Sequence, residues 1–314
     1  MKIAVKNSNV AKVDPLLLAE AREIAHGRFA ANTRRAYQSD FRDFAQFCRD
    51  NDLEFLPAAP ETVVLYLTFL ARHARWSTIK RRVAAINVIH AVKCHPSPID
   101  QTVKDYKESV KRKVGAKVEQ KQALLLDDVK RILALTPEGI KGARDRAMIL
   151  FAFTTWLRAE NLHNLKFEDI AFLRDGLSVK VRKEKQDQAR KGREIIIEYG
   201  KNTETCPVEN LKQWLAMAGI QSGCVFRSVD RHGNVNGSIS YDGILKILKK
   251  YALLAGLNPA KIGCHSLRSG GVTQAIVGGM PVDAAKTYGD WKSAAFDGYI
   301  RRGKQIRATQ YLGV

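Results

Sequence analysis

Hydrophobic residues recur at helical spacing through the first third of the chain. From Thr33 onward, Tyr37, Phe41, Phe44 and Cys48 share one face of a helix, and arginines occupy much of the remaining surface. Pro60 then suits the first turn of a helix reaching Leu70. Two more helices are predicted, Thr78–Val92 with Ser77 as its N-cap and Asp100–Lys113. The N-terminal part is therefore expected to be entirely helical.

The rest of the chain mixes helical and strand patterns. Leu177–Arg182 alternates like a strand, and Glu194–Glu198 is predicted to be its partner across a lysine-rich turn, 183–192. One helix is predicted to start after Asp127 or Asp128, either of which can cap it, and to run through Leu135. Further helices are predicted at Ala143–Leu157, Pro207–Ala218, Ser240–Ala255, Leu267–Val277, Pro281–Thr287 and Ser293–Arg302. The expected fold class is mainly α with a small antiparallel β-sheet.

Domain boundaries follow from length and from one break in the pattern. A chain of 314 residues exceeds what one hydrophobic core usually organises. Residues 114–122 are polar and lack periodicity, as linkers do. We therefore predict a helical domain over 1–115, a linker over 116–121 and a second domain over 122–314.

Charge points to a polyanionic partner. The chain has 52 Lys and Arg against 32 Asp and Glu, a formal charge of +20. Up to Lys117 there are 21 basic and 12 acidic residues, which leaves 31 and 20 after it, so the two parts carry +9 and +11. Because both are basic, both are expected to face the polyanion, although basic surface can also serve solubility alone.

Several classes of protein are disfavoured. The five cysteines are scattered and form no C-x-x-C pair, as in a protein with reduced thiols. The sequence has no phosphate-binding G-x-x-x-x-G-K-[ST] loop and no H-E-x-x-H zinc helix, so we expect no metal and no cofactor. No apolar run approaches the length of about 18 residues that spans a bilayer. A cytoplasmic, nucleoid-associated protein with no membrane partner is expected.

One segment is suited to phosphate chemistry. In Cys264-His-Ser-Leu-Arg268, His265 and Arg268 are three residues apart and can share one helix face, so that imidazole and guanidinium reach one phosphate. Alone, such a pair is more often structural than catalytic. Cys264 could be read as a nucleophile, but its apolar surroundings favour an inert buried thiol.

The pair gains meaning from the motifs that accompany it in order along the chain. Arg158 follows an apolar helix, Lys185 lies in the turn between the two strands, and Gly289-Asp-Trp291 precedes Tyr299-Ile-Arg-Arg. Together these motifs, spread over nearly the whole chain, resemble the tyrosine recombinases, the family of phage integrases and Cre-like site-specific recombinases. The resemblance implies a helical core-binding domain and an α+β catalytic domain that close as a C-shaped clamp on DNA.

The resemblance also implies a role for each matching residue. Arg158 and Arg268 would clamp the scissile phosphate, Lys185 would protonate the departing 5′-oxygen, and His265 would assist proton removal. Trp291 would donate its indole N–H to the phosphate, and Tyr299 would be the nucleophile, with neither metal nor ATP. Lys180, Lys183 and Lys191 compete with Lys185, as Tyr288 and Tyr311 do with Tyr299.

Three departures from the family pattern leave questions open. Asp290 stands where relatives often have the histidine of a Gly-His pair, so either Asp290 or Trp291 could fill that site. The spacing from Trp291 to Tyr299 is one residue shorter than in Cre. Asn161 replaces the usual acidic residue three positions after Arg158, with Glu160 beside it.

The partners implied are double-stranded DNA with a specific recombination site and three further copies of the chain on paired sites. The 15 residues after Tyr299 could dock on a neighbouring protomer, and the need for an accessory DNA-bending protein stays open. Integration, excision and resolution are not distinguished, nor is the target sequence. The candidates for DNA contact in the first domain are Arg34, Arg35, Lys80, Arg81 and Arg82. The alternative is a catalytically impaired DNA-binding regulator on the same fold.

Overall fold

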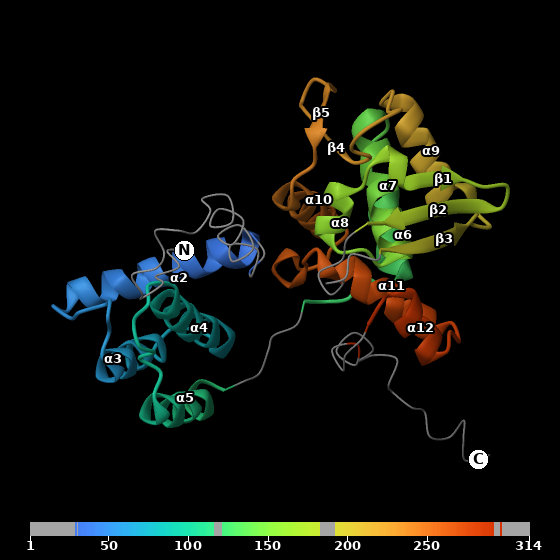
Figure 1. Ribbon diagram of the computed structural model, residues 1–314. Coiled ribbons are helices and arrows are strands. Elements are labelled where there is room, and N and C mark those ends of the chain that lie inside the picture. Colours follow the sequence, from blue (N-terminus) through green and yellow to red (C-terminus); the bar gives the residue numbers. More distant parts are fainter. Residues whose placement is uncertain (1–28, 30, 116–120, 183–191, 292–295, 297–314) are drawn as a thin grey trace, which may run out of the picture. The chain divides into compact units, whose positions relative to one another are not determined.

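The computed structural model describes residues 29, 31–115, 121–182, 192–291 and 296 (Figure 1). The chain divides into two compact units, Met1–Glu119 and Gln120–Val314, and each has its own hydrophobic core. Most of the predicted linker, 116–120, lies outside the described residues. No helix in the described part of the chain is both long enough and apolar enough to cross a bilayer.

Every regular element among the described residues of the N-terminal unit is a helix, as the hydrophobic spacing predicts. Its helices are α2 (Ala31–Asp50), α3 (Pro60–Leu70), α4 (Trp76–Val92) and α5 (Gln101–Val114). Helix α2 packs against α4, and α3 packs against α5. Phe44, Tyr66 and Ile86 are among the fully buried side chains that join these helices into one core.

Two of the predicted helix starts were wrong. Helix α4 begins at Trp76 with Arg75 as its N-cap, so Ser77 lies inside the helix and caps nothing. Helix α6 (Leu126–Ala134) has Leu125 at the N-cap. Asp128 serves this end from the third helical position, where it accepts the Leu125 N–H at 3.1 Å. Trp76, the first residue of α4, packs on the core of the N-terminal unit, and Leu125 stands at the N-cap of α6. In both cases an apolar residue lies at the helix start, where a polar cap residue is usually preferred.

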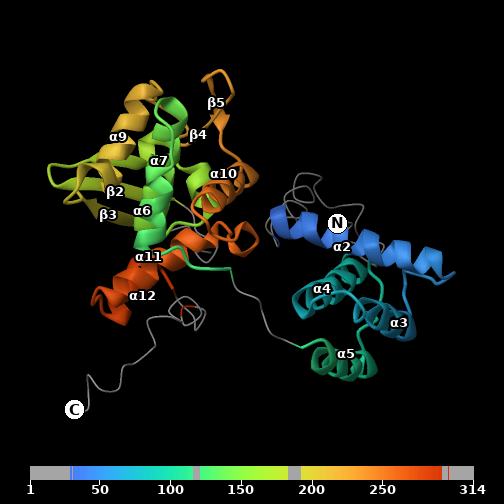
Figure 2. The same cartoon turned by 180° about the vertical axis from the view of Figure 1, so that it is seen from behind.

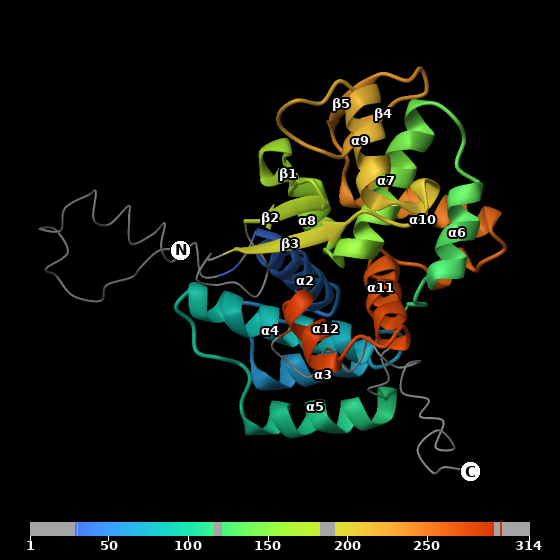
Figure 3. The same cartoon turned by 90° about the vertical axis from the view of Figure 1, so that its right-hand side faces the viewer.

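The C-terminal unit surrounds a central apolar helix. That helix, α7 (Ile140–Thr155), lies beside α9 (Pro207–Met217), and both contact the sheet (Figures 1 and 2). The other helices are α8 (Ala159–Asn164), α10 (Tyr241–Leu254), α11 (His265–Val277) and α12 (Val282–Tyr288). Helices α11 and α12 lie at the opposite end of the unit from the hairpin of β4 (Arg227–Val229) and β5 (Val235–Ser238) (Figure 3).

The antiparallel sheet has the order β1-β2-β3. The two predicted strands are confirmed as β2 (Gly176–Val181) and β3 (Arg193–Glu198), with Val179 opposite Ile195. The edge strand β1 (Ile170–Phe172) and the β4–β5 hairpin were not predicted. Strands of three or four residues are too short to show an alternating pattern.

Candidate active site

Arg158 lies on a tight turn between two helices. The sequence predicted that helix α7 would continue to Leu157, but it ends at Thr155, where Trp156 takes a left-handed conformation with φ of 52°. Arg158 is then extended, half-buried, and the residue immediately before α8. Its carbonyl accepts the N–H groups of Asn161 at 2.9 Å and of Leu162 at 3.1 Å. The turn is thus fixed by the helices on both sides.

Arg268, in the first turn of α11, is held against this turn. Its side chain is only 1% exposed. Nη1 donates to the carbonyl oxygen of Trp156, and Nη2 donates to the carbonyl of Gly289 at 3.0 Å. Because Trp156 is two residues from Arg158, these contacts bring the two predicted phosphate-binding arginines to one turn.

Trp291 covers the Arg268 guanidinium. Arg268 Cζ lies 4.0 Å from the centre of a Trp291 ring, within cation–π range. Trp291 is 7% exposed and packs on Trp156, with ring centres 6.0 Å apart, and on Phe296, with ring centres 5.0 Å apart. The indole is therefore part of an aromatic cluster that surrounds the buried arginine.

The Gly-Asp-Trp turn has the backbone that this packing requires. A Cβ on Gly289 would lie 1.6 Å from the Trp291 ring, so only glycine fits there. Asp290 is left-handed, with φ of 51°, and the Trp291 N–H donates to the Lys286 carbonyl at 3.0 Å. Of the two residues that could fill the histidine site, Trp291 is the one whose ring covers Arg268.

His265 and Arg268 differ in depth although they lie on one helix. His265 is the first residue of α11 and is exposed, whereas Arg268 is buried one turn later. The His265 side chain is thus accessible at the start of the helix that holds the buried guanidinium. This arrangement suits a group that must exchange protons with substrate.

Two competing nucleophiles are unsuited to the task. Burial raises the pKa of Tyr288 to about 12, and its hydroxyl donates to the Thr154 carbonyl at 3.0 Å. Burial also raises the pKa of the Cys264 thiol, which keeps it protonated at neutral pH. Both groups are better suited to packing than to attack on a phosphate.

Lys185 lies outside the described residues, but both strands that lead to its turn are held by hydrogen bonds where they meet the turn. Arg182, just after β2, donates through Nε to the buried Asp169 carboxylate. Arg193, at the start of β3, donates to the carbonyl of Tyr288. Since the next carbonyl, that of Gly289, accepts from Arg268, the hairpin and helix α11 are attached to the same end of α12.

Tyr299 also lies outside the described residues, as do the helix predicted over Ser293–Arg302, the chain beyond it, and the competitor Tyr311. The nearest described residue is Phe296, which is fully buried against Trp291. Within the described residues, no group of three or more His, Cys, Asp or Glu side chains is placed to hold a metal ion.

The basic candidates of the N-terminal unit have different surroundings. Arg34, Arg35 and Lys80 are exposed, and Arg35 donates to the side chain of Asn32. Arg81 and Arg82 instead form ion pairs with Asp40 and Asp43 of α2.

A tight helix contact offers a test of this geometry. A Cβ on Gly271 of α11 would lie 2.1 Å from the Phe153 carbonyl oxygen and 2.5 Å from Trp156 Nε1. Gly271→Ala should therefore push α11 from α7 and lower the free energy of unfolding by about 1–3 kcal/mol. The check is a denaturant titration of the full chain. Gly237→Ala, where the added Cβ meets nothing within 4 Å, is the control and should change little; equal effects would refute the contact.

Comparison with known proteins gives one consistent picture. A family model described as the phage integrase family matches residues 122–297. An integrase/recombinase XerD homolog of Selenomonas ruminantium is 32% identical over 277 residues, covering 86% of this chain and 81% of that protein. Recombinase Cre of Escherichia phage P1 is 28% identical over 150 residues, or 46% of this chain and 44% of Cre.

Solved structures share the fold. A lambda integrase dimer bound to a COC′ core site matches with a TM-score of 0.61 at 16% identity, covering 92% of this chain and 95% of that one. XerH bound to a palindromic difH substrate, in a post-cleavage complex, matches with a TM-score of 0.60 at 16% identity, covering 82% and 72%. The predicted fold class, mainly α with a small antiparallel sheet, is confirmed.

Some residues of the site were not found from the sequence. The main-chain carbonyl of Trp156 accepts a hydrogen bond from Arg268, and the side chain of Arg193 donates to the main-chain carbonyl of Tyr288. No sequence motif marks either contact. Gly289 was part of a quoted motif, but its role as an acceptor for Arg268 was not foreseen. A left-handed tryptophan after an apolar helix is visible only in the backbone.

Proposed function

This chain belongs to the phage integrase family of tyrosine recombinases, and we propose that it cleaves and rejoins DNA at a specific site through a 3′-phosphotyrosyl intermediate on Tyr299. The observation that carries the proposal is the buried, doubly anchored guanidinium of Arg268 beside the turn of Arg158. Both side chains are permanently charged and planar, as binding of phosphate oxygens requires.

Anchoring matters because of what the reaction demands. Phosphoryl transfer concentrates negative charge on the nonbridging oxygens of the phosphate. Donors that are already oriented stabilise that charge without reorganising at the moment of reaction. Two backbone carbonyls and the Trp291 ring orient Arg268 in this way. In this proposal Trp291 positions the arginine, in addition to the donor role that the family resemblance implies.

The proposed step conserves the energy of the phosphodiester. The Tyr299 oxygen bonds to phosphorus as the bond from phosphorus to the 5′-oxygen breaks. His265 accepts the tyrosine proton, and Lys185 gives a proton to the departing 5′-oxygen, so the products are a 3′-phosphotyrosine and a free 5′-hydroxyl. Attack by a second strand's 5′-hydroxyl reverses the step and releases the enzyme.

The proposed partner is duplex DNA, gripped as a clamp by the helical unit and the catalytic unit. Both parts of the chain are basic, +9 and +11, which supports two DNA-contacting surfaces. The lambda integrase and XerH structures are complexes with DNA. We further propose four protomers on two sites, with strand exchange in the cytoplasm. An accessory DNA-bending protein would be a further partner at a site that the recombinase does not bend by itself.

Trapping of the intermediate tests this function. The substrate is a duplex that carries the recognition site and a nick just 3′ of the cleavage point, so that the short fragment with the free 5′-hydroxyl diffuses away after attack. The expected product is a protein–DNA adduct that survives denaturing electrophoresis. Specific binding without any adduct would instead support the DNA-binding regulator.

A further inference from the structure

Helix α4 carries three consecutive basic residues, Lys80, Arg81 and Arg82, in three different environments. Lys80 is exposed. The side chain of Arg81 is 52% exposed and that of Arg82 only 18%. Successive residues on a helix point about 100° apart, so the three cannot have equivalent roles on one surface.

Arg82 joins α4 to two other helices. Its Nη1 and Nη2 donate to the two carboxylate oxygens of Asp43 on α2, at 2.6 and 2.9 Å. Nη1 also donates to the hydroxyl of Tyr66 on α3 at 3.1 Å, and that hydroxyl donates in turn to Asp43. The outer fork of this guanidinium is therefore used inside the protein, and Arg82 is a structural brace.

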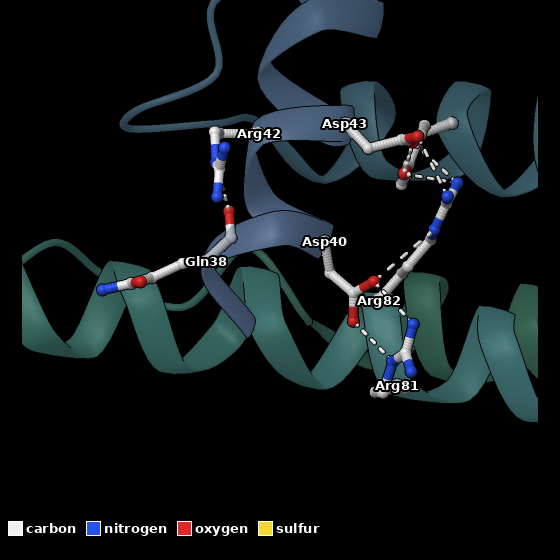
Figure 4. A network of polar contacts seen from close by, with 7 residues as sticks. Gln38, Asp40, Arg42, Asp43, Arg81 and Arg82 are labelled. Atoms are coloured by element: carbon white, nitrogen blue, oxygen red, sulfur yellow. Dashed lines mark hydrogen bonds and ion pairs between the residues drawn. The ribbon is translucent and has the colours of Figure 1, made fainter. Parts of the chain in front are cut away.

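Arg81 is bound by its inner edge instead. Nε donates to Asp40 Oδ2 at 2.7 Å and Nη2 donates to Oδ1 at 2.9 Å, as Figure 4 shows. Asp40 is 4% exposed, so this carboxylate cannot turn outward. Among the described residues, none accepts a hydrogen bond from Nη1 of Arg81. The exposed edge of Arg81, Nη1 with the second hydrogen of Nη2, has a fixed direction.

We propose that Arg81 reads a base edge in DNA and that Asp40 is the positioning residue that makes this reading specific. The inference rests on the proposed function, because it takes the N-terminal unit as a DNA-binding surface. It assigns Lys80 to phosphate contact and removes Arg82 from the set of DNA contacts.

The fixed direction is what favours a base over a phosphate. A phosphate attracts any nearby cation and carries no sequence information. Two parallel donors with a set orientation match the O6 and N7 acceptors of guanine in the major groove. An arginine bound at Nε and Nη2 still presents such a pair. The ion pair with Asp40 already restricts the rotamers of Arg81, so less conformational entropy is lost when DNA binds.

Selection from random duplexes tests the inference. The full chain is mixed with a pool of duplexes randomised over about three helical turns, and the bound fraction is sequenced. The wild type should enrich a motif that includes one guanine in each half-site. Asp40→Asn and Arg81→Lys should each lower the preference at that position by about 10-fold, while other positions keep theirs. The slope of affinity against salt should not change for either variant, because the phosphate contacts remain.

Asp43→Asn is the matched control, since it breaks another ion pair between the same two helices without removing the carboxylate that binds Arg81. It should lower the melting temperature and leave the motif intact. A motif unchanged in Asp40→Asn, or lost to the same degree in Asp43→Asn, overturns the inference. A wild type that enriches no motif overturns it as well. Adduct formation on Tyr299 is read separately, so failure of the chemistry and failure of this inference give different results.

Discussion

Tyr299→Phe is expected to abolish the covalent adduct while DNA affinity stays within about twofold of wild type. In the proposed mechanism, the hydroxyl oxygen of Tyr299 is the atom that attacks phosphorus. Its loss removes the proposed reaction path but only one polar atom from the protein. Denaturing electrophoresis with the nicked duplex measures the adduct, and a gel-shift titration measures the affinity.

Tyr288→Phe is the matched control. Its hydroxyl donates to the Thr154 carbonyl, and its ring packs on Trp156. The substitution should cost about 1 kcal/mol of stability through the lost hydrogen bond and leave adduct formation in place. An adduct that persists in Tyr299→Phe and disappears in Tyr288→Phe would reassign the nucleophile.

Arg268→Lys should slow cleavage by about 10²- to 10³-fold, the effect usual for loss of one preorganised donor. Lysine keeps the charge, but a single ammonium lacks the planar set of N–H donors with which the guanidinium reaches the carbonyls of both Trp156 and Gly289. Single-turnover cleavage of the nicked duplex measures the rate constant.

The control is Arg131→Lys, on the exposed surface of α6, where arginine pairs with Asp128 of the same helix. This change should leave the cleavage rate within about twofold of wild type, because exposed ion pairs contribute little. A rate for Arg268→Lys that equals that of Arg131→Lys would show that the anchored guanidinium is not part of the reaction.

Most helices could be predicted from the sequence because each satisfies a local rule. The apolar spacing of α2 and the proline at the start of α3 need no knowledge of the rest of the chain. The start of α4 was missed because Trp76, which packs on the core, lies one position before Ser77, the polar residue predicted as the cap. Such a start depends on tertiary contact.

The candidate site shows the same division. Arg158, His265, Arg268 and Trp291 were recognised by their order along the chain. Their depths were not predictable, since the burial of Arg268 depends on Trp156, 112 residues earlier, and on Gly289, 21 residues later. Similarly, Arg81 and Arg82 look alike in sequence, but Asp40 binds the inner edge of Arg81 whereas Asp43 binds the outer fork of Arg82, whose Nε lies 3.8 Å from Asp40.

The most direct test of the central claim is to identify the residue that carries DNA. Trypsin cleavage after Lys292 and Arg301 gives the peptide 293–301, in which Tyr299 is the single tyrosine; Tyr288 and Tyr311 lie in other peptides. After the trapped adduct is digested with nuclease and trypsin, mass spectrometry should find the nucleotide mass on the 293–301 peptide. Nucleotide on the peptide of Tyr288 or Tyr311, or on none, would contradict the account.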